Sequence, residues 1–204
     1  MLLNPAGKSA LAARLRESTG AELGEVFSFL SGLYFRGKLT YARAFATIGV
    51  PWSSTLIITA DRGLVPPETV VKRADLERFS DVDISSGDVR YLLPLRRDVE
   101  ELASKIPDSA EVVLLGSIAT GKYVDPLLGA FGSRLLFPLD FVGRGDMSRG
   151  GLLLRSARAG RELEYVAVEG AVRRGSRPPR LEPARSRGRR LPPARARRRS
   201  EADS

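Results

Sequence analysis

The uneven distribution of charge is the feature that most limits what this chain can fold into. Of 33 basic and 24 acidic side chains in 204 residues, 12 and 3 lie in residues 173–204, so residues 1–172 hold 21 of each. Residues 173–204 contain two leucines and no aromatic residue, too little apolar surface to offset the entropy of ordering them. We therefore expect a single folded domain over residues 1–172 and a disordered Arg/Pro-rich tail over 173–204.

Two interpretations of this tail stay open. Its arginines can neutralise phosphates, which would give weak nucleic-acid binding through counterion release. Alternatively it is a solvated extension, because Arg, Pro, Ala and Gly are the residues that GC-rich codons specify. The absence of an aromatic residue for base stacking favours the second interpretation.

The chain contains neither cysteine nor histidine. This composition excludes disulfides, thiolate nucleophiles, Ser-His-Asp triads and ordinary zinc sites. No metal site is expected, and the cofactor, if there is one, is unknown. No stretch reaches the ~20 apolar residues of a membrane span, and the amino terminus lacks a signal-peptide pattern. We expect a cytoplasmic protein without membrane contact.

Short apolar runs of strand length alternate with helical patterns. Runs at 55–59, 112–115 and 134–137 are typical of buried strands. Strands separated by helices predict an α/β fold, with a mostly parallel sheet of about four strands and helices on both faces. Partial alternation in LLLRSA and ELEYVAV adds a C-terminal antiparallel β-hairpin.

Three helix starts are marked by capping residues or proline. Ser9 is placed to cap a helix that runs to about Glu17. Pro94 occupies the first turn of a helix that ends at Pro107, and Asp125-Pro126 marks the start of another. Residues 23–34 and 39–45 have the spacing of core helices.

Four segments have the form of an apolar run followed by a polar loop, the arrangement that holds anionic ligands in α/β proteins. Together they suggest one composite pocket. The segments are Leu2 to Ser9, Leu56 to Leu64, Glu111 to Tyr123 and Leu135 to Gly151.

The third segment carries the strongest motif, GSIATGKY from Gly116 to Tyr123. It matches the phosphate loop G-x-x-x-x-G-K but has tyrosine where that motif needs Ser or Thr for Mg²⁺. We therefore do not expect an ATPase loop. A weaker anion site remains open, as does a plain turn with a solvated lysine. Its ligand-binding candidates are Gly116, Ser117, Thr120 and Lys122.

The other segments supply further candidates. Lys8 and Ser9 would form one wall of the pocket, although the Gly7-Lys8-Ser9 triplet alone has little specificity. Asp61 and Arg62 follow the strand at 55–59, as a general base with its electrostatic partner or as a solvated turn.

The loop DFVGRGDMSRGG, residues 140–151, is the richest in polar chemistry. Arg144 and Arg149 suit bidentate recognition of a phosphate, carboxylate or base edge. Asp146 is a second candidate for a general base.

Part of the chain resembles an uncharacterised family of bacterial and phage domains. The resemblance is carried by LSGLYFRGKLTYARAFA and ITADRGLVPPETVV within residues 30–71, then by YVDPLL and FPLDFVGRG up to residue 145. It implies a Rossmann-like α/β fold with a nucleotide or modified nucleobase as ligand.

These features predict an α/β domain that binds a nucleotide, nucleobase or phosphorylated small molecule, either as a binding protein or as an enzyme of nucleotide or nucleic-acid metabolism. Asp61 or Asp146 would act as base, with Lys122, Arg144 and Arg149 neutralising the anion. The alternative is a non-catalytic interaction protein whose basic tail holds nucleic acid.

Overall fold

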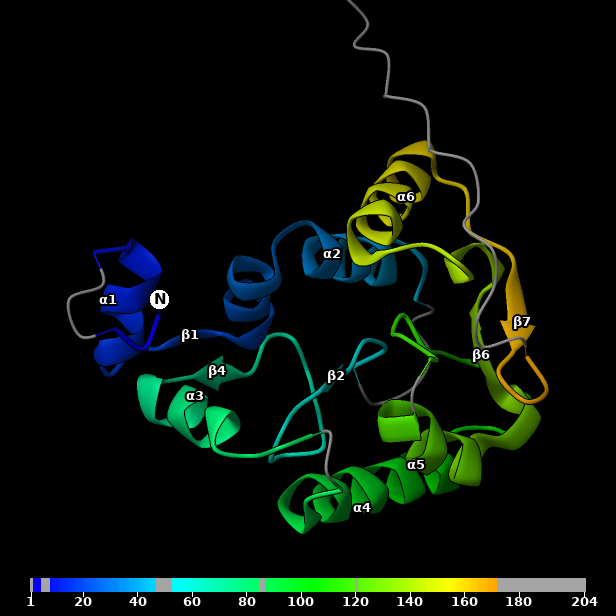
Figure 1. The fold of residues 1–204 in the computed structure, drawn as a ribbon, viewed down its shortest axis with the longest axis horizontal. Helices are drawn as coiled ribbons and strands as arrows, with labels where there is room; N and C mark the ends of the chain where they lie inside the picture. Colours follow the sequence, from blue (N-terminus) through cyan, green and yellow to red (C-terminus); the bar gives the residue numbers. More distant parts are fainter. Residues whose placement is uncertain (1, 5–7, 47–52, 85–86, 120, 172–204) are drawn as a thin grey trace, which may run out of the picture.

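The computed structural model describes residues 2–4, 8–46, 53–84, 87–119 and 121–171, and Figure 1 shows the chain. The helices are α1 (Ala10–Arg16), α2 (Leu23–Phe45), α3 (Arg73–Ser80), α4 (Val89–Lys105), α5 (Gly121–Phe131) and α6 (Asp146–Ala159). The strands are β1 (Ala21–Glu22), β2 (Ile57–Ile58), β3 (Leu64–Val65), β4 (Val70–Val71), β5 (Val112–Val113), β6 (Leu135–Pro138) and β7 (Tyr165–Ala167).

The predicted mostly parallel four-stranded sheet is wrong. Helices, including the short 3-10 helices Gly132–Arg134 and Leu139–Phe141, make up 54% and strands 11% of the described residues, so helices supply most of the packing surfaces. The strands form two antiparallel pairs, β1–β4 and β2–β3, and one sheet of three strands in the order β5-β6-β7. Only β5 and β6 pair in parallel, with α5 as the crossover. The run at 55–59 pairs with β3 across a turn at Gly63 instead of joining a larger sheet.

The predicted C-terminal hairpin is also wrong. LLLRSA belongs to α6, which ends at Gly160 in the left-handed conformation that glycine adopts readily. Residues 165–167 alone form the strand, and β7 pairs antiparallel with β6. The apolar run in LLLRSA was too short to distinguish a strand from a helix.

Two helix starts and the course of a third helix differ from the expectations. Helix α4 begins at Val89, after the carboxylate of Asp88 accepts a hydrogen bond from the Arg90 amide at 2.9 Å, so Pro94 lies inside it. Helix α5 begins at Gly121, so Pro126 also lies inside. Helix α2 continues through Gly37 but is kinked at Gly32, whose φ of 58° and ψ of −131° suit glycine alone. The predicted cap at Ser9 is confirmed by its bond from the Ala12 amide.

Two hydrophobic clusters form the core. The N-terminal cluster gathers residues of α1, α2 and the β1–β4 and β2–β3 pairs around Leu23, Val26 and Val71. The C-terminal cluster gathers α4, α5, α6 and the three-stranded sheet around Leu95 and Phe137. Helix α2 belongs to both, because its first turns lie in the N-terminal cluster and Tyr41 lies in the C-terminal one. Figure 1 shows α1 and β7 at opposite ends of the molecule, with α2 between them.

Candidate functional site

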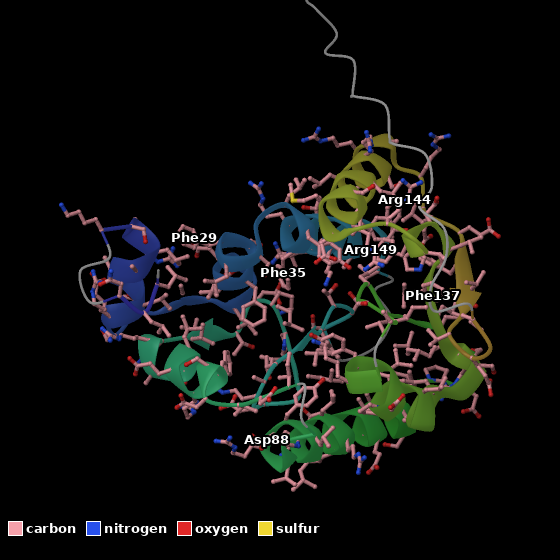
Figure 2. The ribbon with its side chains drawn as sticks, in the orientation of Figure 1. Phe29, Phe35, Asp88, Phe137, Arg144 and Arg149 are labelled. Atoms are coloured by element: carbon pink, nitrogen blue, oxygen red, sulfur yellow. The ribbon has the colours of Figure 1, made fainter. Side chains whose placement is uncertain are left out.

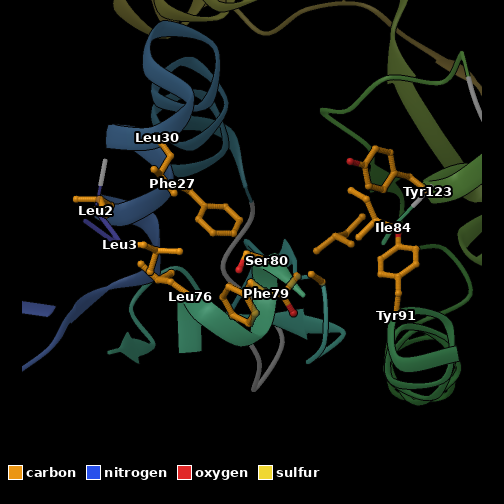
Figure 3. Close-up of a pocket in the computed structure, with 13 residues that line it drawn as sticks. Leu2, Leu3, Phe27, Leu30, Leu76, Phe79, Ser80, Ile84, Tyr91 and Tyr123 are labelled. Atoms are coloured by element: carbon orange, nitrogen blue, oxygen red, sulfur yellow. The ribbon is translucent and has the colours of Figure 1, made fainter. Parts of the chain in front are cut away.

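A pocket of about 450 Å³ lies between the two clusters. Figure 3 shows its walls: Phe27 comes from α2, Phe79 from α3, Tyr91 from α4 and Tyr123 from α5. The short segment Leu2–Leu3 and residues 58–60 complete the lining. Phe27 and Phe79 pack edge to face, with ring centroids 6.4 Å apart. The volume falls within the ~300–1,000 Å³ typical of small-molecule sites.

The polar side chains of this pocket are largely engaged with the backbone. The buried Thr59 hydroxyl donates to the carbonyl of Gly63 at 3.0 Å and accepts from the amide of Arg62 at 3.1 Å. The Ser80 hydroxyl donates to the carbonyl of Glu77 at 2.7 Å. The pocket therefore offers a ligand aromatic faces and few free hydrogen bonds.

Three of the four segments expected to form a composite pocket contribute to this one. They do so through apolar or aromatic residues such as Leu2, Ile58 and Tyr123, whereas the expectation rested on their polar loops. Lys8 is exposed beside α1, and the hydroxyl of Ser9 is occupied by its cap. Figure 1 shows α1, the helix that Ser9 caps, far from α5 and α6, which hold other predicted residues.

Two predicted cations lie against rings that line the pocket. The Lys122 ammonium is 4.9 Å from the ring centroid of Tyr123, and the Arg62 guanidinium is 5.6 Å from that of Phe79. Arg62 is neutralised by a hydrogen-bonded ion pair with Asp75. Lys122 forms no ion pair with any carboxylate in the described part of the chain. Lys122 does not itself line the pocket, but its charge beside the Tyr123 ring is not neutralised by a described carboxylate.

Asp61 belongs to a network of ion pairs. Its carboxylate lies 3.2 Å from the Nε of Arg78 and 3.9 Å from the Nε of Arg62, and it is 15% exposed. Arg62 and Arg78 both also pair with Asp75. Burial alone would raise the pKa of Asp75, but bonds from the Lys72 amide and both arginines lower it. One oxygen of Asp61 is buried without a hydrogen bond; its role as a base stays a prediction.

The loop after β5 has the topology of a phosphate loop, because α5 begins directly at Gly121. Its chemistry differs. The carboxylate of Asp125 lies so close to Gly121 that a Cβ there would be 2.1 Å from it, and this negative charge opposes an anion at the helix start. Gly116 forms part of the turn, and the Ser117 hydroxyl accepts from the Ala119 amide at 3.3 Å. Thr120 lies outside the described residues.

Arg144, Asp146 and Arg149 lie together at the start of α6. Figure 2 shows both arginines at the end of the molecule formed by α6 and β6. Arg144 donates from Nε to the carbonyl of Asp140 at 2.8 Å. Arg149 donates to the carbonyl of Phe141 at 3.2 and 3.0 Å, and its NH1 lies 3.7 Å from Asp146.

Beside Arg149 lie two residues that the sequence did not single out, Tyr34 and Lys38 of α2. Burial lowers the pKa of Lys38 to about 8; Asp146 opposes that shift and Arg149 adds to it. A signal for Lys38 existed, since it falls on the same helical stripe as Tyr34, Tyr41 and Phe45, where a lysine is out of place. The rings of Tyr34 and Phe27 were interpreted only as core.

In the part of the chain that the structure describes, no group of three or more acidic residues is arranged to hold a metal ion. None of the described helices is both long and apolar enough to cross a membrane. Comparisons with family models, curated proteins and solved structures found no match. The resemblance to bacterial and phage domains stays a prediction, apart from its mostly parallel sheet, which the observed strand pairing replaces.

Proposed function

We propose that this protein binds a small molecule with a flat aromatic body and one anionic group, such as a nucleotide. The observation that carries the proposal is the aromatic pocket between the two clusters, with Lys122 against one of its rings. The body would lie among Phe27, Phe79, Tyr91 and Tyr123, and the anionic group would lie towards Lys122.

The aromatic walls of the pocket favour a ligand with a flat ring, because aromatic side chains offer stacking faces and edge contacts to another ring. Tyr91 is held in place, since it is 1% exposed and its hydroxyl donates to the carbonyl of Lys122 at 2.9 Å. The same bond ties α4 to the first turn of α5. A rigid wall loses little entropy when a ligand binds.

The side chain of Lys122 is the reason for proposing an anionic group on the ligand. A lysine serves as a point charge for phosphate without needing the fixed geometry of an arginine. The Asp125 carboxylate at Gly121 argues against the loop amides as the phosphate site, so we assign the charge recognition to the side chain of Lys122.

A thermal-shift series on the full chain tests this proposal. The ligands are a nucleobase, its nucleoside, its nucleotide and ribose phosphate, which separates the ring from the charge. We expect the nucleotide to raise Tm most, the nucleoside less, and ribose phosphate not at all. At 100 times its Kd a ligand stabilises the native state by ~2.7 kcal/mol.

Variants assign the effect to the pocket. Lys122→Ala should reduce the nucleotide shift to that of the nucleoside, while Lys8→Ala, at an exposed lysine outside the pocket, should leave it unchanged. Equal shifts from ribose phosphate and the nucleotide, or an unaltered shift in Lys122→Ala, would contradict the assignment.

A further inference from the structure

Two cations lie near one another where α2 crosses α6. The Lys38 ammonium lies 4.0 Å from the ring centroid of Tyr34, and the Arg149 guanidinium lies 5.3 Å from that of Phe141. These two rings touch edge to face, with centroids 6.5 Å apart. Each cation thus rests on one ring of a contacting pair, although burying like charges together is unfavourable.

The close helix crossing enforces this proximity. Gly37 of α2 and Gly150 of α6 meet without side chains, and a Cβ on Gly37 would lie 2.7 Å from the carbonyl oxygen of Gly150. Lys38 and Arg149 are the sequence neighbours of these glycines. The backbone approach therefore holds both cations at the crossing.

The negative charge at the crossing does not balance the positive charge. Asp146 lies 3.7 Å from Arg149, but its side chain is 69% exposed. Among the described residues no carboxylate forms an ion pair with Lys38. Burial lowers the pKa of Lys38 to about 8, helped by Arg149 and opposed by Asp146. The cluster therefore carries an uncompensated positive charge.

A hydroxyl without a partner adjoins these cations. The Tyr34 oxygen is buried and no acceptor among the described residues lies within hydrogen-bond geometry of its O–H, while the Arg149 guanidinium, which can only donate, lies beside it. Burial raises the pKa of Tyr34, with Arg149 opposing the shift and the negative charges of Asp146 and an ionised Tyr123 adding to it. The hydroxyl thus stays protonated at neutral pH. A buried donor without an acceptor costs ~1–3 kcal/mol, so an acceptor that reached it would bind favourably.

We propose that Lys38, Arg149 and Tyr34 form a binding site for a small oxyanion, a phosphate or a carboxylate. Lys38 supplies the unpaired charge, Arg149 a second charge, and the Tyr34 hydroxyl one hydrogen bond. Tyr123 of the pocket wall is near enough to Tyr34 to affect its pKa, but none of the three residues lines the aromatic pocket, so the site stands whether or not the pocket takes a nucleotide.

Lysine-selective NMR on the full chain tests this site with inorganic phosphate and acetate as probes. The sequence has five lysines and none of them lies in residues 173–204. Anions that bind to the arginines of that segment therefore add no lysine signal to the spectrum. The loss of one signal in Lys38→Met assigns Lys38. We expect a probe to move the Lys38 signal saturably and to raise its pKa by ~1 unit, with sodium chloride of equal ionic strength as the control.

The variants give a second readout. Tyr34→Phe should weaken the affinity for the probe about fivefold, which corresponds to the loss of one hydrogen bond. Lys122→Ala should leave the response of the Lys38 signal intact. Saturation by phosphate alone or acetate alone identifies which oxyanion the site takes. A Lys38 signal that responds to neither probe beyond the chloride control overturns the proposal, and so does a response lost in Lys122→Ala, which would place the ion in the pocket.

Discussion

Lys38 occupies a stripe of α2 that is otherwise aromatic. Tyr34, Tyr41 and Phe45 lie three to seven positions away on the same face and pack on the C-terminal cluster. A lysine here keeps its ammonium over the ring of Tyr34 instead of extending to solvent. The native state therefore tolerates the neutral amine of Lys38 better than its charged ammonium.

This position makes stability depend on pH in a defined direction. The pKa of Lys38 falls from 10.5 to about 8 on folding, so between these values the unfolded chain holds more protons and stability rises with pH. Lys38→Met should be more stable than the natural chain at about pH 7, by at most ~3 kcal/mol, and this advantage should shrink towards about pH 9.5. Urea unfolding at several pH values measures it.

Lys8→Met provides the matched control, because Lys8 is exposed. It should leave the free energy of unfolding unchanged across the same range. The raised pKa values of Tyr34 and Tyr91 lower stability only above the ordinary tyrosine pKa of 10. Below pH 10, these two tyrosines therefore do not obscure the effect of Lys38 on the pH dependence of stability. An advantage of Lys38→Met that is independent of pH would contradict the prediction.

The sequence predicted some residues of the two proposed sites and missed others for a physical reason. Lys122, Asp146 and Arg149 stood out because they are polar residues in glycine-rich loops. Tyr34 and Tyr91 did not, since an aromatic ring at helical spacing has the same pattern whether it fills a core or lines a pocket. Which ring faces a cavity depends on how α2, α4 and α5 pack, and this is a property of the tertiary structure.

At the scale of elements, the crossing of α2 and α6 depends on one glycine more than on its neighbour. A Cβ on Gly150 would lie 2.8 Å from the backbone of Leu33 and Tyr34, whereas one on Gly151 would meet nothing nearer than 3.8 Å. Gly150→Ala should therefore destabilise the protein by ~1–3 kcal/mol. Gly151→Ala should stabilise it by ~0.5–1 kcal/mol, because alanine favours a helix interior.

Chemical denaturation of the two variants measures both effects at adjacent positions of one helix. The opposite order of stabilities, or equal effects, would show that α6 does not pack on α2 through Gly150. Far-UV circular dichroism serves as the control that α6 keeps its helical content.

Helix existence was easier to predict than helix starts. Pro94 and Pro126 indicated first turns, but α4 and α5 begin five residues before each proline, because Asp88 caps α4 earlier and α5 opens at Gly121. The parallel pairing of β5 and β6 around α5 followed from the alternation of strand and helix. The pairing of β2 with β3 could not be predicted in this way, since an apolar run in the sequence does not show which strand it will pair with.

At the scale of the whole molecule, the last buried residue of the described core is Val168, and Ala171 packs against it. We therefore predict that removing residues 173–204 leaves Tm and the nucleotide-induced shift unchanged. Any binding of DNA by the full chain should weaken steeply with salt and disappear with the tail, as the interaction hypothesis requires. Differential scanning fluorimetry and fluorescence anisotropy measure these outcomes. A lower Tm without the tail, or salt-insensitive DNA binding by residues 1–172, would contradict this division of the chain.

The aromatic pocket separates two cores that are otherwise joined mainly along α2. A molecule bound there would contact both clusters, so it would stabilise their packing on one another and lower the population of any state in which they separate. Bound protein would then be cleaved by a protease more slowly than free protein, in step with the ligand concentration.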